Sequence, residues 1–102
     1  RFGADAVPHL ARVLQAGEPA ERRHAAEALG AIGETLAVPA LAGALTDPEP
    51  DVRLAAVLAL GAIPGPESAA AVEQSAAAAD PRVRSVGRRL AADRATPRQR
   101  SR

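Results

Sequence analysis

The sequence contains no cysteine, methionine, tryptophan, tyrosine or lysine, and its single aromatic residue is Phe2. The absence of cysteine excludes disulfide and thiol chemistry, so the sequence does not indicate a redox compartment. No apolar run approaches the roughly 18 residues of a membrane-spanning helix. No secretory leader is visible either, and we therefore expect a cytoplasmic protein without a membrane partner.

All 13 basic residues are arginine, and alanine, glycine and proline are abundant. This composition is typical of the coding bias of high-GC bacteria. The 102 residues suffice for one small domain. An alanine-rich core buries little area per residue, so we expect a stability of only ~5 kcal/mol. The start at Arg1, without methionine, suggests a fragment of a longer chain.

A pattern recurs along the chain every 31 residues. The positions that match at this step include three prolines and three arginines: Pro19, Pro50, Pro81, Arg22, Arg53 and Arg84. Leu29-Gly30 of the first copy returns as Leu60-Gly61 in the second, whereas the third copy lacks this pair. A fixed period of this length predicts supersecondary units that stack on one another.

Each copy contains the pattern of two helices joined by a turn. Val7, Leu10 and Leu14, for example, lie at the spacing of one helical face. Gly33 is expected to end the second helix and Thr35 to cap the third. The six helices are expected at about residues 5–15, 20–32, 35–45, 51–62, 67–79 and 81–93.

The sequence therefore predicts an all-α protein, an α-α superhelix (short α-solenoid) of three stacked antiparallel helix pairs. A single pair cannot bury its apolar face, so the pairs must stack. The repeat domain is expected over residues 1–94, with repeats at about 5–33, 34–64 and 65–94. Residues 95–102 form a basic tail without large apolar residues, which we expect to be disordered.

The middle copy is the most complete. It contains Ala37-Val38-Pro39-Ala40-Leu41, Asp47-Pro48, Val52-Arg53 and Ala59-Leu60-Gly61-Ala62-Ile63. With these residues the chain, over about residues 5–92, resembles the HEAT-repeat family, and within it the short phycobilisome-lyase HEAT-like repeats. The resemblance implies an armadillo-like superhelix that acts as a protein-binding scaffold. Some members of the family bind nucleic acid, and a few are enzymes.

In this family an aspartate of the inter-helix turn and an arginine of the second helix often form a hydrogen-bonded ladder between repeats. Asp47 and Arg53 match that pair. Arg22 and Arg84 match the arginine in the other copies, where alanine stands at the aspartate position. The resemblance therefore implies a structural role for these four residues, with only one copy supplying both partners.

Signals of catalysis or metal binding are few. His9 and His24 are the only histidines, and the His-Glu dipeptide that HEAT-fold iron hydroxylases use is missing. Glu21 and Glu27 lie three residues from His24 on either side, a pattern more typical of a solvated face than of a metal site. Neither a phosphate-binding loop nor a nucleophile elbow is present. We expect no catalytic, cofactor-binding or metal-binding residues and no enzyme activity; a fragment of a lyase-like HEAT enzyme is the least favoured alternative.

The second helices of HEAT arrays usually line the concave surface, where partners dock. A helical wheel turns these positions away from the core: Arg23, His24 and Glu27; Leu54, Ala55 and Leu58; Ser85, Val86 and Arg89. The middle copy thus has two leucines where its neighbours have charge, and exposed apolar patches often mark interaction sites. We predict a protein-binding strip of Leu54 and Leu58, rimmed by Arg23, Glu27 and Arg89. The alternative is that the leucines pack against a neighbouring helix.

Charge is distributed unevenly. Residues 1–79 hold five arginines and ten acidic residues, whereas residues 80–102 hold eight arginines and two acidic residues. The basic end would attract nucleic acid or another polyanion through its arginines and the tail: Arg82, Arg88, Arg89 and Arg94. No aromatic residue accompanies them for base stacking, and a solvated cap on the array explains the charge equally well. A protein is therefore the expected partner, and a polyanion is the alternative.

Overall fold

The computed structural model describes residues 3–95, and all regular elements in this range are helices. The six α-helices are α1 (Val7–Ala16), α2 (Pro19–Ile32), α3 (Val38–Gly43), α4 (Pro50–Ala62), α5 (Pro66–Ser75) and α6 (Pro81–Ala95). Three short 3-10 turns extend α1 and α3: Ala4–Ala6, Thr35–Ala37 and Ala44–Thr46. The tail predicted to be disordered lies outside the described residues, apart from the backbone of Ala95.

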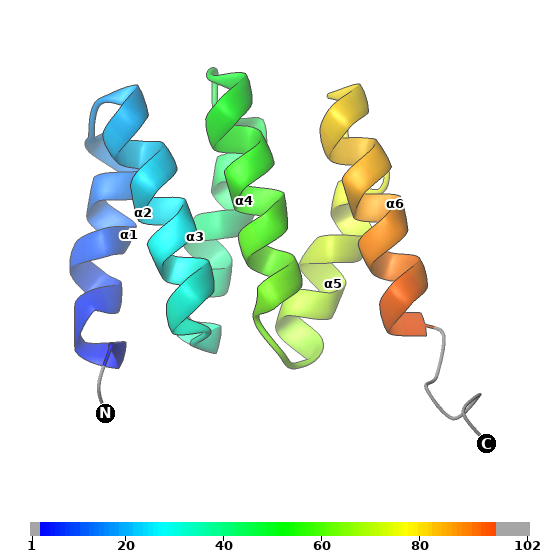
Figure 1. Cartoon of the computed structure of the whole chain (residues 1–102), viewed down its shortest axis with the longest axis horizontal. Coiled ribbons are helices and arrows are strands. Elements are labelled where there is room, and N and C mark those ends of the chain that lie inside the picture. The colour runs from blue at the N-terminus through cyan, green and yellow to red at the C-terminus, as the bar shows by residue number, and fades with distance from the viewer. Residues whose placement is uncertain (1–2, 96–102) are drawn as a thin grey trace.

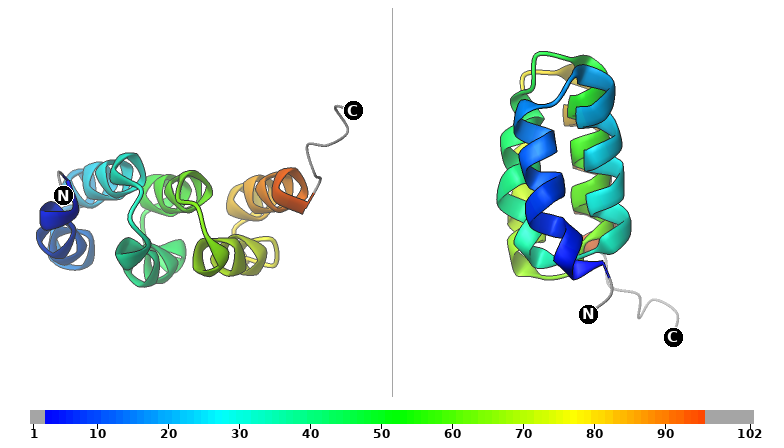
Figure 2. Two further views of the ribbon diagram at one scale, coloured as in Figure 1. Left: turned by 90° about the horizontal axis from the view of Figure 1, so that it is seen from below. Right: turned by 90° about the vertical axis from the view of Figure 1, so that its left-hand side faces the viewer.

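The helices form three antiparallel pairs that follow one another along the long axis of the molecule (Figure 1). Seen along the helices, α2, α4 and α6 form one layer, and α1, α3 and α5 form the other (Figure 2). Each second helix packs on its own first helix, and α2 and α4 also pack on the second helix of the pair that follows them. The prediction of a short all-α solenoid is therefore confirmed.

Proline marks where most of these helices begin. It is the first residue of α2, α4, α5 and α6, a position at which its missing N–H costs no helical hydrogen bond. Before α2, Glu18 and Glu21 form a reciprocal capping box. Gly33 ends α2 in the left-handed conformation with φ 76°, as expected. Thr35 is not the cap that was predicted, because it is already the first residue of the 3-10 turn that follows Glu34.

The fifth helix is shorter than the sequence suggested. Alanine propensity predicted that it continues to Ala79, but it ends at Ser75. Beyond Ser75 the amides of three successive residues bond to carbonyls three positions back, which tightens the chain into turns. The side chain of Ser75 is fully buried, and its hydroxyl donates to the carbonyl of Val72. Tertiary packing, rather than local propensity, thus fixes this boundary.

One apolar core runs between the two layers. Its largest fully buried side chains are Leu29, Leu41, Leu60 and Ile63. Glycine then sets the distance between the helices of the second layer. A Cβ atom at Gly30 would lie 2.8 Å from the Cα of Ala59, so the backbones of α2 and α4 approach closely at this point.

Candidate functional site

Arg22 joins the first repeat to the second. Its Nε and Nη2 donate to Asp47 Oδ2 and Oδ1 at 2.9 and 3.0 Å, which is a bidentate pair. Its Nη1 donates to the carbonyl of Gly17 at 2.7 Å, within its own repeat. The guanidinium is thereby held on both sides, and the pair runs from one repeat to the next.

Arg53 repeats this arrangement with a different acid. Its Nε donates to Asp80 Oδ2 at 2.7 Å, while its Nη1 donates to the backbone carbonyl of Asp47 at 2.8 Å. Asp80 also caps α6, because its Oδ1 accepts the amides of Arg82 and Val83. Arg53 therefore bonds to the carboxylate of the following repeat and not to that of its own copy.

The expectation that only the middle copy supplies both partners is wrong. Counting by 31 residues placed Ala78 at the aspartate position and overlooked Asp80. Asp80 stands instead at the register of Glu18 and Glu49, immediately before the first proline of the second helix. An acid directly before that proline was the signal in the sequence that would have found it.

Arg84, the third arginine of the series, has no carboxylate partner among the described residues. Its Nη1 donates to the carbonyls of Ala78 and Ala79 at 3.0 and 3.3 Å, as Arg22 and Arg53 do within their own repeats. The described solenoid therefore contains two arginine–aspartate pairs and one arginine held in the same way without an acid.

Both acids of these pairs have lowered pKa values. Burial alone would raise the pKa of Asp47, but hydrogen bonds from Arg22 and from the amide of Glu49 bring it below its ordinary value. For Asp80 the hydrogen bond from Arg53 is the main cause of a lowered pKa. Since the folded pKa values are depressed, the stabilisation is complete above the unfolded pKa of about 3.9 and is lost as the pH falls through the folded values.

We therefore expect acid to cost the wild type more stability than it costs the double variant Asp47→Asn/Asp80→Asn. Asparagine keeps the shape and can still accept a hydrogen bond, but it carries no charge to lose. Urea unfolding followed by circular dichroism at pH 6 and at pH 3 measures the difference. The double variant should be the less stable protein at pH 6. The difference in free energy of unfolding between it and wild type should become smaller at pH 3. A gap that stays constant between the two pH values would contradict the prediction.

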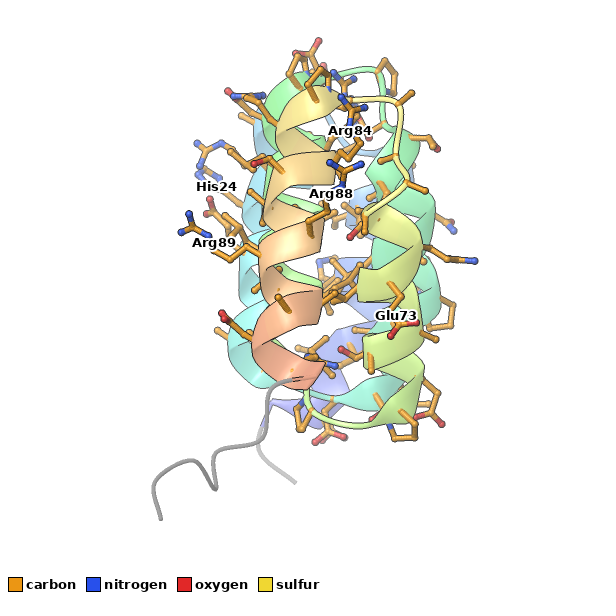
Figure 3. All side chains as sticks on the ribbon, turned by 90° about the vertical axis from the view of Figure 1, so that its right-hand side faces the viewer. His24, Glu73, Arg84, Arg88 and Arg89 are labelled. Carbon is orange, nitrogen blue, oxygen red and sulfur yellow. The ribbon has the colours of Figure 1, made fainter. Side chains whose placement is uncertain are left out.

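The predicted partner-binding residues lie on the outer face of the second-helix layer. Arg23 and Glu27 form a salt bridge along α2, with 3.0 Å between Nη1 and Oε2. Leu58 of α4 is 52% exposed, whereas Leu54 is partly buried and packs against the core. Arg89 projects from α6 toward the same side (Figure 3). The alternative stated from the sequence, that the two leucines pack inside the protein and do not form a binding strip, thus applies to Leu54 and not to Leu58.

The helical wheel was wrong for Leu54, which packs against the core, and for two further positions. Ala55 is buried, and Val86 is partly buried against the core, although both were expected to face away from it. Both stand at the register that meets the preceding second helix. His24 has the same register but is exposed, because no helix precedes α2 on that side in the part of the chain that is described.

A shallow hollow of about 260 Å³ opens on the outer face between α2 and α4. Glu27, Ala31, Leu58 and Ala62 are among the residues that line it. Leu58 thus stands at the edge of a depression whose other wall carries a charged side chain. An apolar group flanked by charge is the usual composition of a small protein-binding patch.

Arg94 serves a structural purpose. Its Nη2 donates to the carbonyl of Ile63 at 2.6 Å and to Ser68 Oγ at 3.1 Å, just beyond the end of α4. These bonds satisfy groups that the helix end leaves without partners. Arg94 is therefore not available to a polyanion in the way the sequence suggested, whereas Arg82, Arg88 and Arg89 are exposed.

The described range holds neither a cluster of metal ligands nor a membrane-spanning helix. No three histidine or acidic side chains within residues 3–95 gather closely enough to hold a metal ion. His24 Nε2 instead lies 3.2 Å from Arg23 Nη2. None of the described helices has the length and apolar character needed to cross a membrane.

The repeated helix pairs and their arginine–aspartate links agree with the result of sequence comparison. Residues 7–91 match the family model for HEAT repeats. This chain belongs to the HEAT-repeat family. HEAT repeats are in general protein-interaction scaffolds, and the predicted resemblance is confirmed over nearly the range expected. None of the curated proteins compared with the chain matches it.

Proposed function

We propose that this HEAT-repeat chain is a non-enzymatic scaffold that binds another protein through the outer face of α2, α4 and α6. The observation that carries the proposal is Leu58, which is 52% exposed on a face where the neighbouring repeats have Glu27 and Arg89. A single exposed leucine has little meaning by itself. Its place beside a hollow and between charged residues supports a binding role.

The residues on this face indicate what chemical groups a partner would need in order to bind there. The hollow between α2 and α4 accepts an apolar side chain against Leu58, and complementary charge is required around it. Glu27 is already paired with Arg23, so it would contribute orientation more than affinity. Arg89 offers a guanidinium on the opposite flank for a carboxylate or a carbonyl of the partner.

The alternative function is binding of a polyanion by the arginines of α6. Arg82, Arg88 and Arg89 support it, since all three are exposed. Arg94 no longer does, because it caps the end of α4. The salt dependence of the binding affinity distinguishes the two functions. A polyanion complex weakens steeply as the salt concentration rises, whereas an apolar contact does not. The cytoplasmic location expected from the sequence stays a prediction.

Leu58→Asp is expected to weaken binding of the partner at least about tenfold, because it places a charge in the apolar centre of the contact. The partner would first be captured from lysate treated with nuclease and identified by mass spectrometry. It would then be purified and titrated against wild type and variant at low and high salt.

Leu36→Asp is the matched control. Leu36 is 75% exposed but lies in the 3-10 turn before α3, so the same substitution there should leave binding unchanged. Circular dichroism would establish that both variants remain folded. Equal binding by Leu58→Asp and wild type, or capture that disappears with nuclease, would contradict the scaffold proposal; the second result would favour the polyanion.

A further inference from the structure

The two interfaces between repeats differ in how completely their arginine is paired. Arg22 donates through Nε and Nη2 to both oxygens of Asp47, and through Nη1 to a backbone carbonyl. Arg53 donates through Nε to one oxygen of Asp80, and through Nη1 to two backbone carbonyls. The other oxygen of Asp80 accepts two amides of the first turn of α6. Arg53 Nη2 therefore has no acceptor among the described residues.

A difference at one register explains the incomplete pairing. Asp47 lies 25 residues after Arg22, and the residue at the same distance after Arg53 is Ala78. The methyl group of Ala78 cannot accept a hydrogen bond, and Asp80, two residues later, serves the arginine with one oxygen only. The Arg53 side chain is 23% exposed, against 15% for Arg22. Part of the Arg53 guanidinium thus stays open to solvent.

A hollow of about 580 Å³ lies beside Arg53, between the 3-10 extension of α3 and the end of α5. The starts of α4 and α6, at the top of Figure 1, mark this edge of the solenoid. The corresponding hollow at the first interface has only about 350 Å³, and Asp47 rather than an arginine lines it. The larger hollow falls within the usual size range of small-ligand sites.

The walls of the hollow at Arg53 combine apolar surface with a further hydrogen-bonding group. Ala42, Leu45 and Ala78 provide apolar surface. Gln74 is exposed at the rim, and its side-chain amide has no hydrogen-bond partner within residues 3–95. An open guanidinium and an amide beside an apolar wall are the groups that recognise a carboxylate attached to an apolar side chain.

The charge around the hollow also favours an anion. Arg53 lines it, and Arg84 is held behind its wall by hydrogen bonds to two of the carbonyls there. One acid, Asp80, lies among the lining residues. The carboxylate of Asp47 is already paired with Arg22. Two arginines are thus balanced by one carboxylate at this hollow, which leaves an excess of positive charge.

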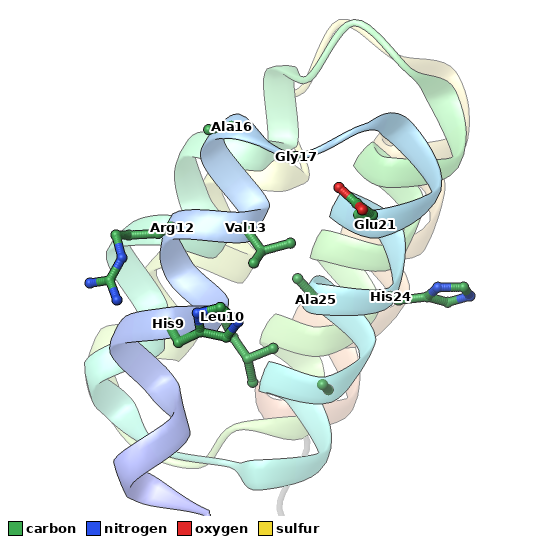
Figure 4. Close-up of a pocket in the computed structure, with 10 residues that line it drawn as sticks. His9, Leu10, Arg12, Val13, Ala16, Gly17, Glu21, His24 and Ala25 are labelled. Atoms are coloured by element: carbon green, nitrogen blue, oxygen red, sulfur yellow. The ribbon is translucent and has the colours of Figure 1, made fainter.

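The hollow at Arg53 is different in kind from a hollow of about 760 Å³ between α1 and α2. Leu10 and Val13 project into the latter (Figure 4), and their counterparts in the second repeat are buried. The hollow in Figure 4 is therefore part of a face on which repeats stack. The repeats on either side of Arg53 are already packed on one another. A ligand or a chain end can enter between them, whereas a further repeat cannot.

We propose that the hollow at Arg53 binds the free carboxyl end of a protein chain whose last residue is apolar. The terminal carboxylate accepts hydrogen bonds from Arg53 Nη2 and from the amide of Gln74. The last side chain packs on Leu45 and Ala78. At a chain end the carboxylate and the apolar side chain belong to one residue, and the chain has to leave the hollow in one direction only. This site is separate from the patch around Leu58 and does not depend on it.

The probe is a short synthetic peptide that ends in leucine with a free carboxyl group, titrated into the ¹⁵N-labelled chain. Amide signals of residues 42–46 and 74–79 should shift and approach saturation at about 5 mM peptide, which fills most of a site with a dissociation constant of about 1 mM. The same peptide with an amidated end should bind at least about fivefold more weakly, because the charge-assisted hydrogen bonds are lost. An amidated peptide with aspartate before the leucine tests whether a side-chain carboxylate suffices.

Ala78→Asp supplies the internal acid that the first interface has in Asp47. The new carboxylate should pair with Arg53 and abolish peptide binding. Ala16→Asp is the matched control, because Ala16 has the same register in the first repeat, is exposed and does not line the hollow. It should leave binding unchanged, as should Leu58→Asp on the outer layer. Circular dichroism establishes that each variant is folded.

Gln74→Ala is a second variant, and it does not alter the arginine–aspartate pair. Because Gln74 is exposed, the substitution should leave the fold intact and weaken peptide binding severalfold. This variant decides the outcome if Ala78→Asp fails to fold.

Four results would overturn the proposal. The first is the absence of shifts around the hollow at about 5 mM of the free-end peptide. The second is equal affinity for the free and the amidated peptide. The third is unchanged binding by folded Ala78→Asp or by Gln74→Ala. The fourth is equal or tighter binding of the amidated aspartate peptide, since a side chain and not a chain end would then be the occupant.

Discussion

Valine in place of Gly30 is expected to lower the free energy of unfolding by about 3 kcal/mol, the upper part of the usual range for overpacking. The first added carbon would lie 2.8 Å from both the Cα and the Cβ of Ala59. Both residues are buried where α2 meets α4, and a backbone atom cannot rotate away as a side chain can. Urea unfolding followed by helical circular dichroism measures the loss.

A paired comparison separates this clash from the intrinsic effect of removing a glycine. Gly43 lies in helical conformation, φ −62°, and a Cβ atom there would have no neighbour within 4 Å. Gly43→Ala should therefore stabilise the protein by about 0.5–1 kcal/mol. Gly30→Ala makes the same chemical change and should destabilise it. If both alanine variants gained stability, close approach of α2 and α4 would not be a feature of the folded protein.

Leu60→Ala is expected to cost about 3 kcal/mol, within the range of 2–5 kcal/mol for buried leucine. Leu60 is fully buried on α4, the helix that packs on the first, second and third repeats. Truncation leaves a void that the surrounding helices cannot fill without moving. Because the whole domain is expected to have only ~5 kcal/mol of stability, the variant should unfold at a much lower urea concentration.

Leu36→Ala provides the comparison for this second prediction. The Leu36 side chain is 75% exposed, so its removal should change the stability by no more than about 0.5 kcal/mol. Measuring both variants in one urea series gives the difference directly. Similar losses at Leu36 and Leu60 would show that burial in the α4 core is not what stabilises the protein.

The architecture could be predicted because the period of the sequence carries it. A 31-residue step with proline at the start of each second helix gives the number of helices and their order. Stacking follows because no single pair can bury its apolar face. The ends of the helices were harder to predict from the sequence, as α5 shows. Its alanines favour a longer helix, but Ser75 is buried and the residues after it form turns, so the helix ends there.

The candidate sites depended on information that the period does not contain. A helical wheel shows which residues share a face, but it does not show on which side the next repeat lies. Ala55 and Val86 were therefore placed outside although both face the preceding second helix. Asp80 was missed for a related reason, because the link between α5 and α6 supplies its acid two residues later than a strict repeat predicts.

The stacking of α4 between its neighbours also bears on how the chain folds. The helices that pack extensively on one another belong to the same or to adjacent repeats, so the contact order is low. Low contact order reduces the loop-closure entropy of folding and predicts rapid kinetics. Only the middle repeat gains an interface on each side within the described chain. Folding should therefore nucleate around α4 and spread outward, and the outer repeats should fray first.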